Sequence, residues 1–481
     1  MPEEHLQFID GEWRAGEGDT IESRNPASPD DVVGSGEEAT REQARAAIEA
    51  AKQASEEWGS TNPDERDAVL YEIAGLIERD LDEIAETLTR EEGKPISSAR
   101  GEVGRTAEIF RYFAGEARRA TGDTVPSGDS ETLTYTVREP LGVVSLITPW
   151  NFPTATPGWK IAPALAAGNA VIFKPSSVTP LVAKHLVELF EEAGLPDGVV
   201  NLLVGPGSTV GDEITTNEGV DGISFTGSNG VGEHIASVAA DQAIPVQTEM
   251  GGKNPQIVLP DADLNAAADG AVAGAYGGTG QACTATSRLV VHEDVVDELE
   301  SKVVDRVREL SIGPGLDDPD LGPASHEDQH ETNFEYVDIG QEESAELLYG
   351  GSEPSEDLDG YYIEPTVFGD VDTEMRIAQE EIFGPVLGII TVGDYEEAVE
   401  VANDIQFGLS ASVFTSDMER VRQFVSDSES GVVKINGTTT GSDIQMPFGG
   451  MKASSSETHK ELGQRAYTFY THEKAVYRTD P

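Results

Sequence analysis

The single cysteine of this 481-residue chain, Cys283, lies in a stretch that could support covalent chemistry. Four glycines precede it within ten residues, and the polar run 284–288 and the apolar run 289–291 follow it. A thiol on a glycine-rich approach, just ahead of a predicted buried strand, could act as the nucleophile toward a small molecule. A free cysteine is also often a small core hydrophobe. The stretch alone leaves both interpretations open.

Polar side chains at the ends of predicted strands could complete such a site. Asn151 follows the apolar run 141–148 and could be an oxyanion donor or a turn asparagine that bonds its own backbone. Lys174 ends the run 169–174 and could neutralise a phosphate, bond a ribose or simply be solvated. Glu249 precedes a Gly-Gly turn and could reach a cleft or be one more surface acid.

The segment 225–232 joins a predicted strand to the start of a predicted helix through a glycine-bearing turn. Free backbone N–H groups at such a helix start bind anions readily. The spacing of its glycines differs from the dinucleotide fingerprint G-x-G-x-x-G, so the segment indicates an anion site without specifying a nucleotide.

The elements that must position these residues alternate regularly. Strands are predicted at 141–148, 169–174, 199–204, 222–226 and 245–249, with helices at 157–167, 179–193 and after residues 207 and 228. Such alternation predicts a parallel, doubly wound sheet with helices on both faces. Ligands bind beyond the carboxyl ends of strands in such sheets. A second α/β set is predicted after residue 254, including a helix at 263–275.

The remaining segments are predicted as scaffold. Before residue 120 we expect a hairpin at 6–14 and helices at 40–52, from residue 62, and at 101–120. The alternating segment 132–138 predicts an exposed edge strand that pairs with another chain or domain. A loop-rich acidic stretch is expected at 317–359, and strands are expected at 467–472 and 475–478.

Six motifs in this order resemble those of the aldehyde dehydrogenase superfamily, over nearly the whole chain: 149–153 (PWNFP), 225–228 (FTGS), 249–253 (EMGGK), 280–283 (GQAC), 380–385 (EEIFGP) and 447–450 (PFGG). The resemblance implies an α/β fold with a Rossmann-type cofactor domain, an α/β catalytic domain and a small β oligomerisation domain. By that resemblance we assign residues 1–123 and 141–250 to NAD(P) binding, 251–445 to catalysis, and 124–140 with 446–481 to oligomerisation.

The resemblance also implies roles for particular residues. Cys283 would be the nucleophile that attacks an aldehyde, Glu249 the general base that activates the hydrolytic water, and Asn151 an oxyanion donor. The cofactor would be bound by Trp150, Lys174, Ser177, Gly227, Ser228, Gly232, Glu381 and Phe383. No metal is expected. Two other interpretations stay open: a CoA-acylating dehydrogenase, which generally lacks the base at Glu249, and a non-enzymatic protein on this scaffold.

The cofactor and substrate predictions rest on local differences from the superfamily. Relatives often carry glutamate three residues after the strand-end lysine, where Ser177 stands here, so we predict NADP over NAD, with NAD possible. The motifs are most similar to 2-oxoglutarate semialdehyde (2,5-dioxopentanoate) dehydrogenases of pentose and sugar-acid breakdown. Succinate and glutarate semialdehydes are the alternatives. Ala282 replaces an arginine common before the nucleophile, so a substrate carboxylate would need other partners; Arg111 or the serines 454–456 are the candidates.

Charge excludes several classes of partner. The chain has 89 acidic residues against 32 Lys and Arg, for a net charge of −57, so we expect no nucleic acid and no anionic membrane as partner. Because the acids are spread over periodic segments, we predict a folded protein from a halophile rather than a disordered one. No signal segment or long apolar run is apparent, so we expect a cytoplasmic protein. The family resemblance implies a homodimer or homotetramer that acts on a small-molecule aldehyde.

Overall fold

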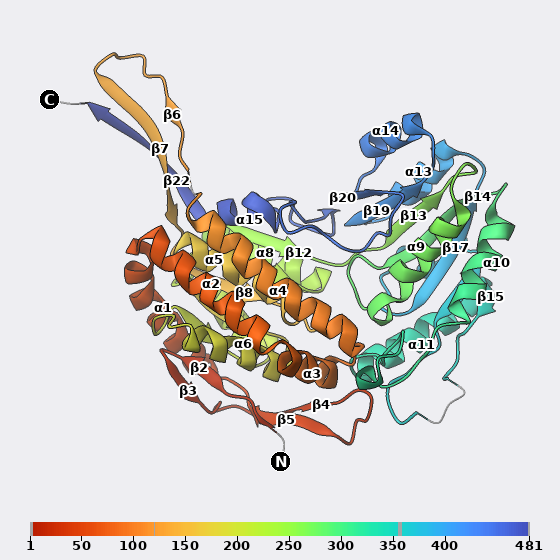
Figure 1. The fold of residues 1–481 in the computed structure, drawn as a ribbon, viewed down its shortest axis with the longest axis horizontal. Helices are drawn as coiled ribbons and strands as arrows, with labels where there is room; N and C mark the ends of the chain where they lie inside the picture. The colour runs from red at the N-terminus through yellow and green to blue at the C-terminus, as the bar shows by residue number, and fades with distance from the viewer. Residues whose placement is uncertain (1–2, 120, 355–357, 480–481) are drawn as a thin grey trace.

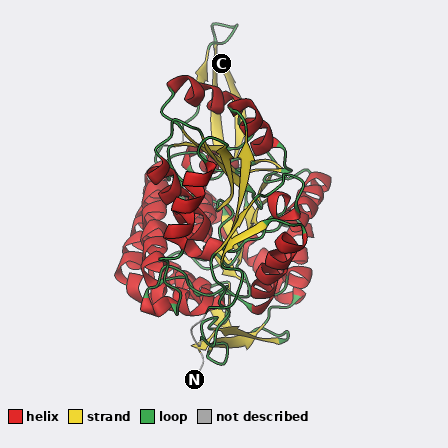
Figure 2. Cartoon of the chain, turned by 90° about the vertical axis from the view of Figure 1, so that its right-hand side faces the viewer, coloured by secondary structure: helices red, strands yellow, loops and turns green. Residues whose placement is uncertain are grey.

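The computed structural model describes residues 3–119, 121–354 and 358–479. Two α/β units lie side by side, and a long β arm extends from one of them (Figure 1). Viewed from the side, helices flank the strands on both sides (Figure 2). Among the described helices, none is long and apolar enough to cross a membrane.

The first unit is built on a seven-stranded sheet of order β12-β11-β8-β9-β10-β2-β3. Its parallel strands are those predicted from the alternating segment: β8 (Val143–Ile147), β9 (Ala170–Lys174), β10 (Val200–Leu202), β11 (Gly222–Thr226) and β12 (Val246–Glu249). The predicted hairpin adds β2 (Gln7–Ile9) and β3 (Glu12–Arg14) in antiparallel pairing. Asp10 and Gly11 both have positive φ, as the tight turn of this hairpin requires.

Strand order creates a switch point in this sheet. From β8 the chain adds β9 and β10 on one side, and β11 and β12 on the other. The carboxyl ends of β8 and β11 are therefore adjacent where the connections diverge, which is where open α/β sheets bind ligands. Asn151 follows β8, and the predicted anion segment follows β11.

Helices cover both faces of the first sheet. One face packs against α2 (Pro63–Arg79), α3 (Leu81–Glu92), α4 (Ile96–Ala117), α5 (Ala155–Ala167), α6 (Pro180–Glu192) and α15 (Gly463–Phe469). The other packs against α1 (Arg41–Ser60), α7 (Asp212–Thr216) after the π-helical turn η1 (Gly207–Gly211), and α8 (Asn229–Gln242). Thr40 and Gln43 form the capping box predicted for α1.

The second unit has a seven-stranded sheet of order β15-β16-β17-β14-β13-β19-β20. Its parallel strands are β13 (Asn254–Val258), β14 (Thr286–His292), β16 (Thr366–Gly369), β17 (Val386–Val392), β19 (Ser410–Phe414) and β20 (Val432–Ile435), and β15 (Glu346–Tyr349) is antiparallel. One face packs against α9 (Leu264–Tyr276) and α10 (Val296–Val307). The opposite face packs against α11 (Glu327–Glu342), α12 (Arg376–Gln379), α13 (Tyr395–Asn403) and α14 (Met418–Asp427).

The arm is a separate three-stranded sheet of order β22-β7-β6. It consists of β6 (Thr124–Val125), β7 (Thr132–Pro140) and β22 (Thr471–Thr479). The strand predicted as an edge, β7, is in fact central, because the C-terminal segment pairs with it over nine residues. Two smaller sheets complete the chain: β1 (Glu3–Glu4) with β5 (Val32–Glu37) and β4 (Thr20–Arg24), and β18 (Phe407–Gly408) with β21 (Met451–Lys452).

Four other predictions of local structure were wrong or incomplete. Helix α11 and strand β15 occupy part of the stretch 317–359 that we expected to be loop. The segment 467–472 begins in helix α15, where burial of alternating aromatic side chains overrides their preference for strands. Helix α3 and strands β4 and β5 were missed. The predicted helix at 101–120 starts earlier and ends at Ala117, and residue 120 lies outside the described residues.

Candidate active site

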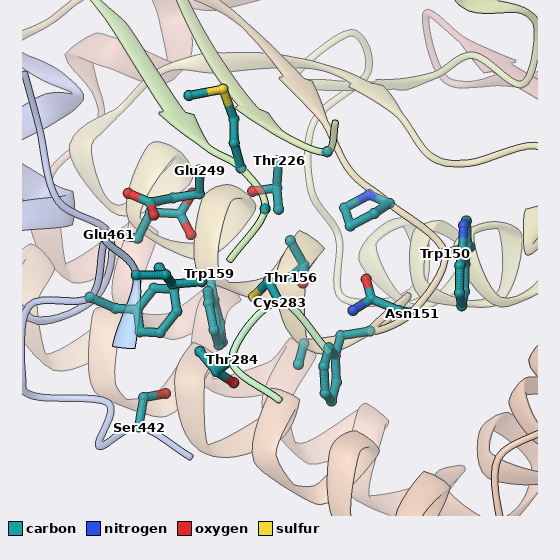
Figure 3. A pocket seen from close by; sticks show the side chains of 18 of the residues that line it. Trp150, Asn151, Thr156, Trp159, Thr226, Glu249, Cys283, Thr284, Ser442 and Glu461 are labelled. Atoms are coloured by element: carbon teal, nitrogen blue, oxygen red, sulfur yellow. The ribbon is translucent and has the colours of Figure 1, made fainter. Parts of the chain in front are cut away.

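Between the two units lies a cavity of about 610 Å³, which contains most of the predicted site residues. Cys283, Asn151 and Glu249 line it together, although they are far apart in the sequence (Figure 3). Five of the predicted cofactor residues also line it: Trp150, Gly227, Ser228, Glu381 and Phe383. Lys174, Ser177 and Gly232 do not line this cavity.

Cys283 is held by an unusual backbone. It follows the 3₁₀ turn η2 (Gly277–Gly280) and precedes β14. The backbone of Gly278, Thr279 and Gly280 has positive φ, and a Cβ at Gly280 would meet the Gly384 carbonyl oxygen at 2.4 Å. Glycine is thus required at position 280. The Asn254 amide donates hydrogen bonds to the carbonyls of Cys283 (2.8 Å) and Ala285 (2.9 Å), which fixes the loop.

The environment of the thiol favours its protonated form. Burial raises the pKa of Cys283, and the negative charges of Glu381, Glu249 and Glu461 raise it further. The backbone N–H of Cys283 itself acts in the opposite direction. The thiol is half-buried and forms no disulfide. Cys283 is therefore a protonated thiol at the wall of a cavity, and its predicted attack on an aldehyde would require loss of a proton.

Asn151 is fixed beside the cysteine loop. Its side chain is buried, and Nδ2 donates a hydrogen bond of 2.9 Å to the carbonyl oxygen of Gln281. An amide nitrogen carries two hydrogens, so one remains for a ligand. Figure 3 shows the amide facing the same space as the sulfur of Cys283. This geometry suits an oxyanion donor and excludes the alternative that Asn151 only bonds its own turn.

Glu249 is a buried carboxylate with few partners. Its Oε2 accepts a hydrogen bond of 3.0 Å from the Gly450 N–H, and Ser455 Oγ lies 3.5 Å from Oε1. Burial raises its pKa well above the ordinary value, and the charge of Glu461 raises it further. A carboxylate with a raised pKa can take a proton from water near neutral pH. Glu249 is therefore no ordinary surface acid.

A second buried carboxylate, Glu461, was not found by sequence reasoning. It lines the cavity and forms a fully buried ion pair with Lys160. Lys160 Nζ also donates to Ser224 Oγ (2.8 Å), while Glu461 Oε2 has no partner among the described residues. In Figure 3 the carboxylates of Glu249 and Glu461 lie next to each other. In a chain with 89 acids, nothing in the local sequence marks Glu461.

The predicted cofactor residues of the second unit gather on one wall of the cavity. Glu381 accepts a hydrogen bond of 2.8 Å from the Gly252 N–H, and burial raises its pKa to about 7. Phe383 has a φ of 60°, which turns its ring against Trp150 at a centroid distance of 5.4 Å. Trp150 packs edge-on against this ring and so forms an aromatic wall beside Asn151.

The first unit contributes a lysine and an open helix start. Lys174 is buried at the end of β9, and its Nζ bonds only the Pro175 carbonyl (3.3 Å) among the described residues. Burial lowers its pKa to about 8, while the charge of Glu38 acts in the opposite direction. Ser177 follows this strand in a half-buried position. A charged lysine so short of partners is suited to a ligand with oxygen acceptors.

Helix α8 begins at the switch point without a side-chain cap. Its N-cap is Ser228, and Thr226 Oγ1 is buried without a partner among the described residues. The Gly227 N–H donates to the Glu249 carbonyl (3.1 Å), which ties the helix start to β12. A Cβ at Gly232 would meet Met250 Sδ at 2.4 Å, so glycine lets the helix pack closely. The free N–H groups fit an anion such as a phosphate.

Ala282 stands where relatives often have arginine, and the residues that we expected to take the place of that arginine do not line the cavity. Arg111 is paired with Glu78 on the outside of α4 and does not line the cavity. Ser454 and Ser455 bond to Gly251 and Glu249 behind the cavity wall, and Ser456 bonds to Thr248. Arg105, which sequence reasoning missed, does line the cavity.

Comparisons with known proteins identify the family and the fold of the chain. The sequence matches the aldehyde dehydrogenase family over residues 13–476. It is 47% identical over 480 residues to alpha-ketoglutarate semialdehyde dehydrogenase of Haloferax volcanii, covering 99% of each chain. It is 42% identical to 2,5-dioxopentanoate dehydrogenase of Saccharolobus solfataricus, covering 98% of each. The fold matches a crystal structure of betaine aldehyde dehydrogenase from Staphylococcus aureus in complex with NAD+, with a TM-score of 0.96 and 37% identity, covering 99% of this chain and 95% of that one.

Proposed function

The chain belongs to the aldehyde dehydrogenase family, and we propose that it oxidises 2-oxoglutarate semialdehyde (2,5-dioxopentanoate) to 2-oxoglutarate with NADP. The observation that carries the chemistry is the convergence of Cys283, Asn151 and Glu249 on one cavity. The substrate is supported by the names of two relatives that match the chain from end to end. The product, 2-oxoglutarate, is an acid of central metabolism. We propose that the reaction is a step in the breakdown of pentoses and sugar acids.

The reaction begins at Cys283. Its sulfur bonds the aldehyde carbon, the S–H proton passes to a water molecule, and the carbonyl π electrons move to oxygen. The second Nδ2 hydrogen of Asn151 and the backbone N–H of Cys283 hydrogen-bond that oxygen as its charge develops. These donors are fixed in place beforehand by the Gln281 and Asn254 contacts, so little reorganisation is needed.

A nicotinamide cofactor, when bound, supplies the oxidation by accepting the aldehyde hydrogen as a hydride. The residues present fit such a group. Lys174 and Thr226 are buried polar groups short of partners, and the α8 start is uncapped. Glu381 presents a carboxylate that could bond a ribose, and Phe383 with Trp150 forms an aromatic wall beside Asn151.

Oxidation leaves a thioester on Cys283, and Glu249 completes the cycle. A water gives its proton to the carboxylate and its oxygen bonds the thioester carbon. The C–S bond then breaks, which releases the acid and restores the sulfur of Cys283. In this structure the carboxylate bonds Gly450, so its side chain must turn toward Cys283 to reach that water. Glu249 supports hydrolysis as the outcome, rather than transfer to CoA.

Cofactor preference follows from the charges near Lys174. Ser177 leaves room for a 2′-phosphate, which supports NADP. Glu38 contributes a negative charge near the lysine and favours NAD. Because Lys174 is buried and close to the proposed phosphate, we propose that its charge outweighs that of the half-exposed Glu38. The ratio of kcat/KM for NADP and NAD measures the preference directly, and a strong preference for NAD would contradict it.

We propose that the arm built from β6, β7 and β22 pairs chains into a dimer or tetramer, as part of an oligomerisation region at 124–140 and 446–481. The arm exposes Leu133, Val125 and Tyr477. Residues 448–461 of that region also bond Glu249 and Lys160, so the region reaches the active site. With a net charge of −57, we expect assembly and stability to rise with salt, as for a halophilic protein.

The test of the proposed function compares the wild-type chain with Cys283→Ala in high-salt buffer. We expect wild type to form NADPH with 2-oxoglutarate semialdehyde at a higher kcat/KM than with succinate or glutarate semialdehyde. Cys283→Ala should form none above background, because no other thiol exists in the chain. Circular dichroism of both proteins checks that the variant is folded. NADPH formation by a folded Cys283→Ala protein would overturn the mechanism.

A further inference from the structure

The cavity has a second end, away from the aromatic wall. In Figure 3, Trp159, Thr284 and Ser442 lie on the other side of Cys283 from Trp150. Arg105, from α4, lines the cavity and donates a hydrogen bond to the carbonyl oxygen of Ser442, which places it at this end. Among the described residues that line the cavity, it is the one cationic side chain.

The charge of Arg105 is poorly neutralised. Its one ion pair among the described residues joins Nη1 to Glu108 at 4.0 Å, and the Glu108 side chain is 62% exposed. The cavity acid on the same helix, Glu102, is already engaged: it bonds Lys94 (2.7 Å) and both the N–H and the hydroxyl of Thr154 (2.9 Å each). An exposed, screened pair such as that of Arg105 with Glu108 leaves most of the cation's charge for a ligand.

Trp159 supplies a donor without a partner at the same end. Its indole Nε1 is buried and has no hydrogen-bond partner among the described residues. The ring packs against Phe448 at a centroid distance of 5.1 Å, so the indole is held in position. A buried donor without a partner is costly, and a ligand oxygen in the cavity would remove that cost.

We propose that Arg105 binds the carboxylate at the far end of an acidic aldehyde, while the Trp159 N–H donates to an oxygen along its length. This proposal rests on the proposed function, because it requires the aldehyde carbon to lie at Cys283. In Figure 3 the carboxylates of Glu249 and Glu461 lie above Trp159, and Ser442, which bonds Arg105, lies below it, so these acids would repel the substrate carboxylate toward Arg105. Arg105 thus orients the substrate as well as holding it. Its charge also repels aldehydes that carry a quaternary ammonium group.

The experiment measures kcat/KM for succinate semialdehyde (4-oxobutanoate), 2-oxoglutarate semialdehyde, pentanal and betaine aldehyde with wild type and Arg105→Gln. The readout is the ratio of kcat/KM for each acidic aldehyde to that for pentanal. We expect Arg105→Gln to lower this ratio by about 10- to 100-fold, chiefly through KM, which is the range for a hydrogen bond to a charged group. Arg105→Lys should recover part of the ratio, since it keeps the charge and loses the planar fork.

Arg111→Gln is the matched control. It removes a guanidinium from the same helix that is paired with Glu78 and does not line the cavity, so the ratio should stay at the wild-type value. An unchanged ratio in Arg105→Gln would overturn the assignment of Arg105, and so would an equal fall in Arg111→Gln. A wild-type protein that oxidises betaine aldehyde better than 4-oxobutanoate would overturn it as well. If wild type oxidised none of the aldehydes, the proposed function itself would fail.

Discussion

The two ends of the cavity differ in their charges. At the reacting end, buried acids surround Cys283, and burial raises the pKa values of Glu249, Glu381 and the thiol itself. At the far end, one half-buried cation, Arg105, has only a distant ion-pair partner. The first end holds acid–base groups whose pKa values are raised by burial. The second holds a guanidinium, whose part is to attract an anion.

This difference separates the tasks of reaction and selection. Acid–base groups can move the protons that thiol attack and thioester hydrolysis require. A permanent charge is of no use for proton transfer, but it can discriminate between an acidic and a neutral aldehyde. Changes at the reacting end should therefore alter the rate for all aldehydes alike. Changes at the far end should alter the choice among them.

Asn151→Ala should give the largest effect among the changes that test this separation. It removes a fixed oxyanion donor, and we expect kcat/KM to fall roughly 100- to 1,000-fold. The fall should be the same for pentanal and 4-oxobutanoate, because both form the same oxyanion. Steady-state kinetics with the two aldehydes measures it. A loss confined to the acidic aldehyde would show that Asn151 selects among substrates, which contradicts the separation of reaction from selection.

The dependence on pH should distinguish the two ends without any mutation. Because the pKa values of Glu249 and Cys283 are raised, their reactive, deprotonated forms increase as pH rises. We expect kcat to rise by about tenfold per pH unit below the controlling pKa and then to level off. The acidic-to-neutral specificity ratio should stay constant over the same range, since both kinds of aldehyde react through the same Cys283 and Glu249. A kcat that is flat from pH ~6 to ~9 would contradict the raised pKa values.

Glu38→Gln should give the smallest effect, and only on the cofactor. Its charge acts on Lys174, so removing the charge should raise kcat/KM for NADP relative to NAD by about 2- to 5-fold, the size of a screened charge interaction. The choice among aldehydes should not change. Measuring kcat/KM for NADP and for NAD with wild type and the variant checks this. A shift toward NAD would show that Glu38 does not oppose a 2′-phosphate.

The sequence allowed the central features to be predicted because they are local. Parallel strands show as short apolar runs, and Asn151, Lys174 and Glu249 each stand at the end of one. The prediction that the cysteine is a nucleophile needed these partners and the family motifs considered together. Where the apolar pattern was weak, as in α11 with only three buried residues, the prediction of a loop was wrong.

The far end could not be predicted because it depends on helix rotation and on distant pairing. Arg111 was the candidate on α4, but Arg105 lies six residues away, about 240° around the helix axis, and faces the cavity instead. Glu461 meets Lys160 across 301 residues, so its burial has no local signal. The positive φ of Phe383 likewise depends on the packed surroundings.

The most direct test of acid–base work at the reacting end is a single-turnover experiment with Glu249→Gln. The variant is mixed with 2-oxoglutarate semialdehyde and NADP, quenched in acid, digested and examined by mass spectrometry. We predict one equivalent of NADPH per site, followed by turnover about 100- to 10,000-fold slower than wild type, with the acyl group on the peptide that contains Cys283. Continued NADPH formation at the wild-type rate, or an acyl group on any other peptide, would contradict the account.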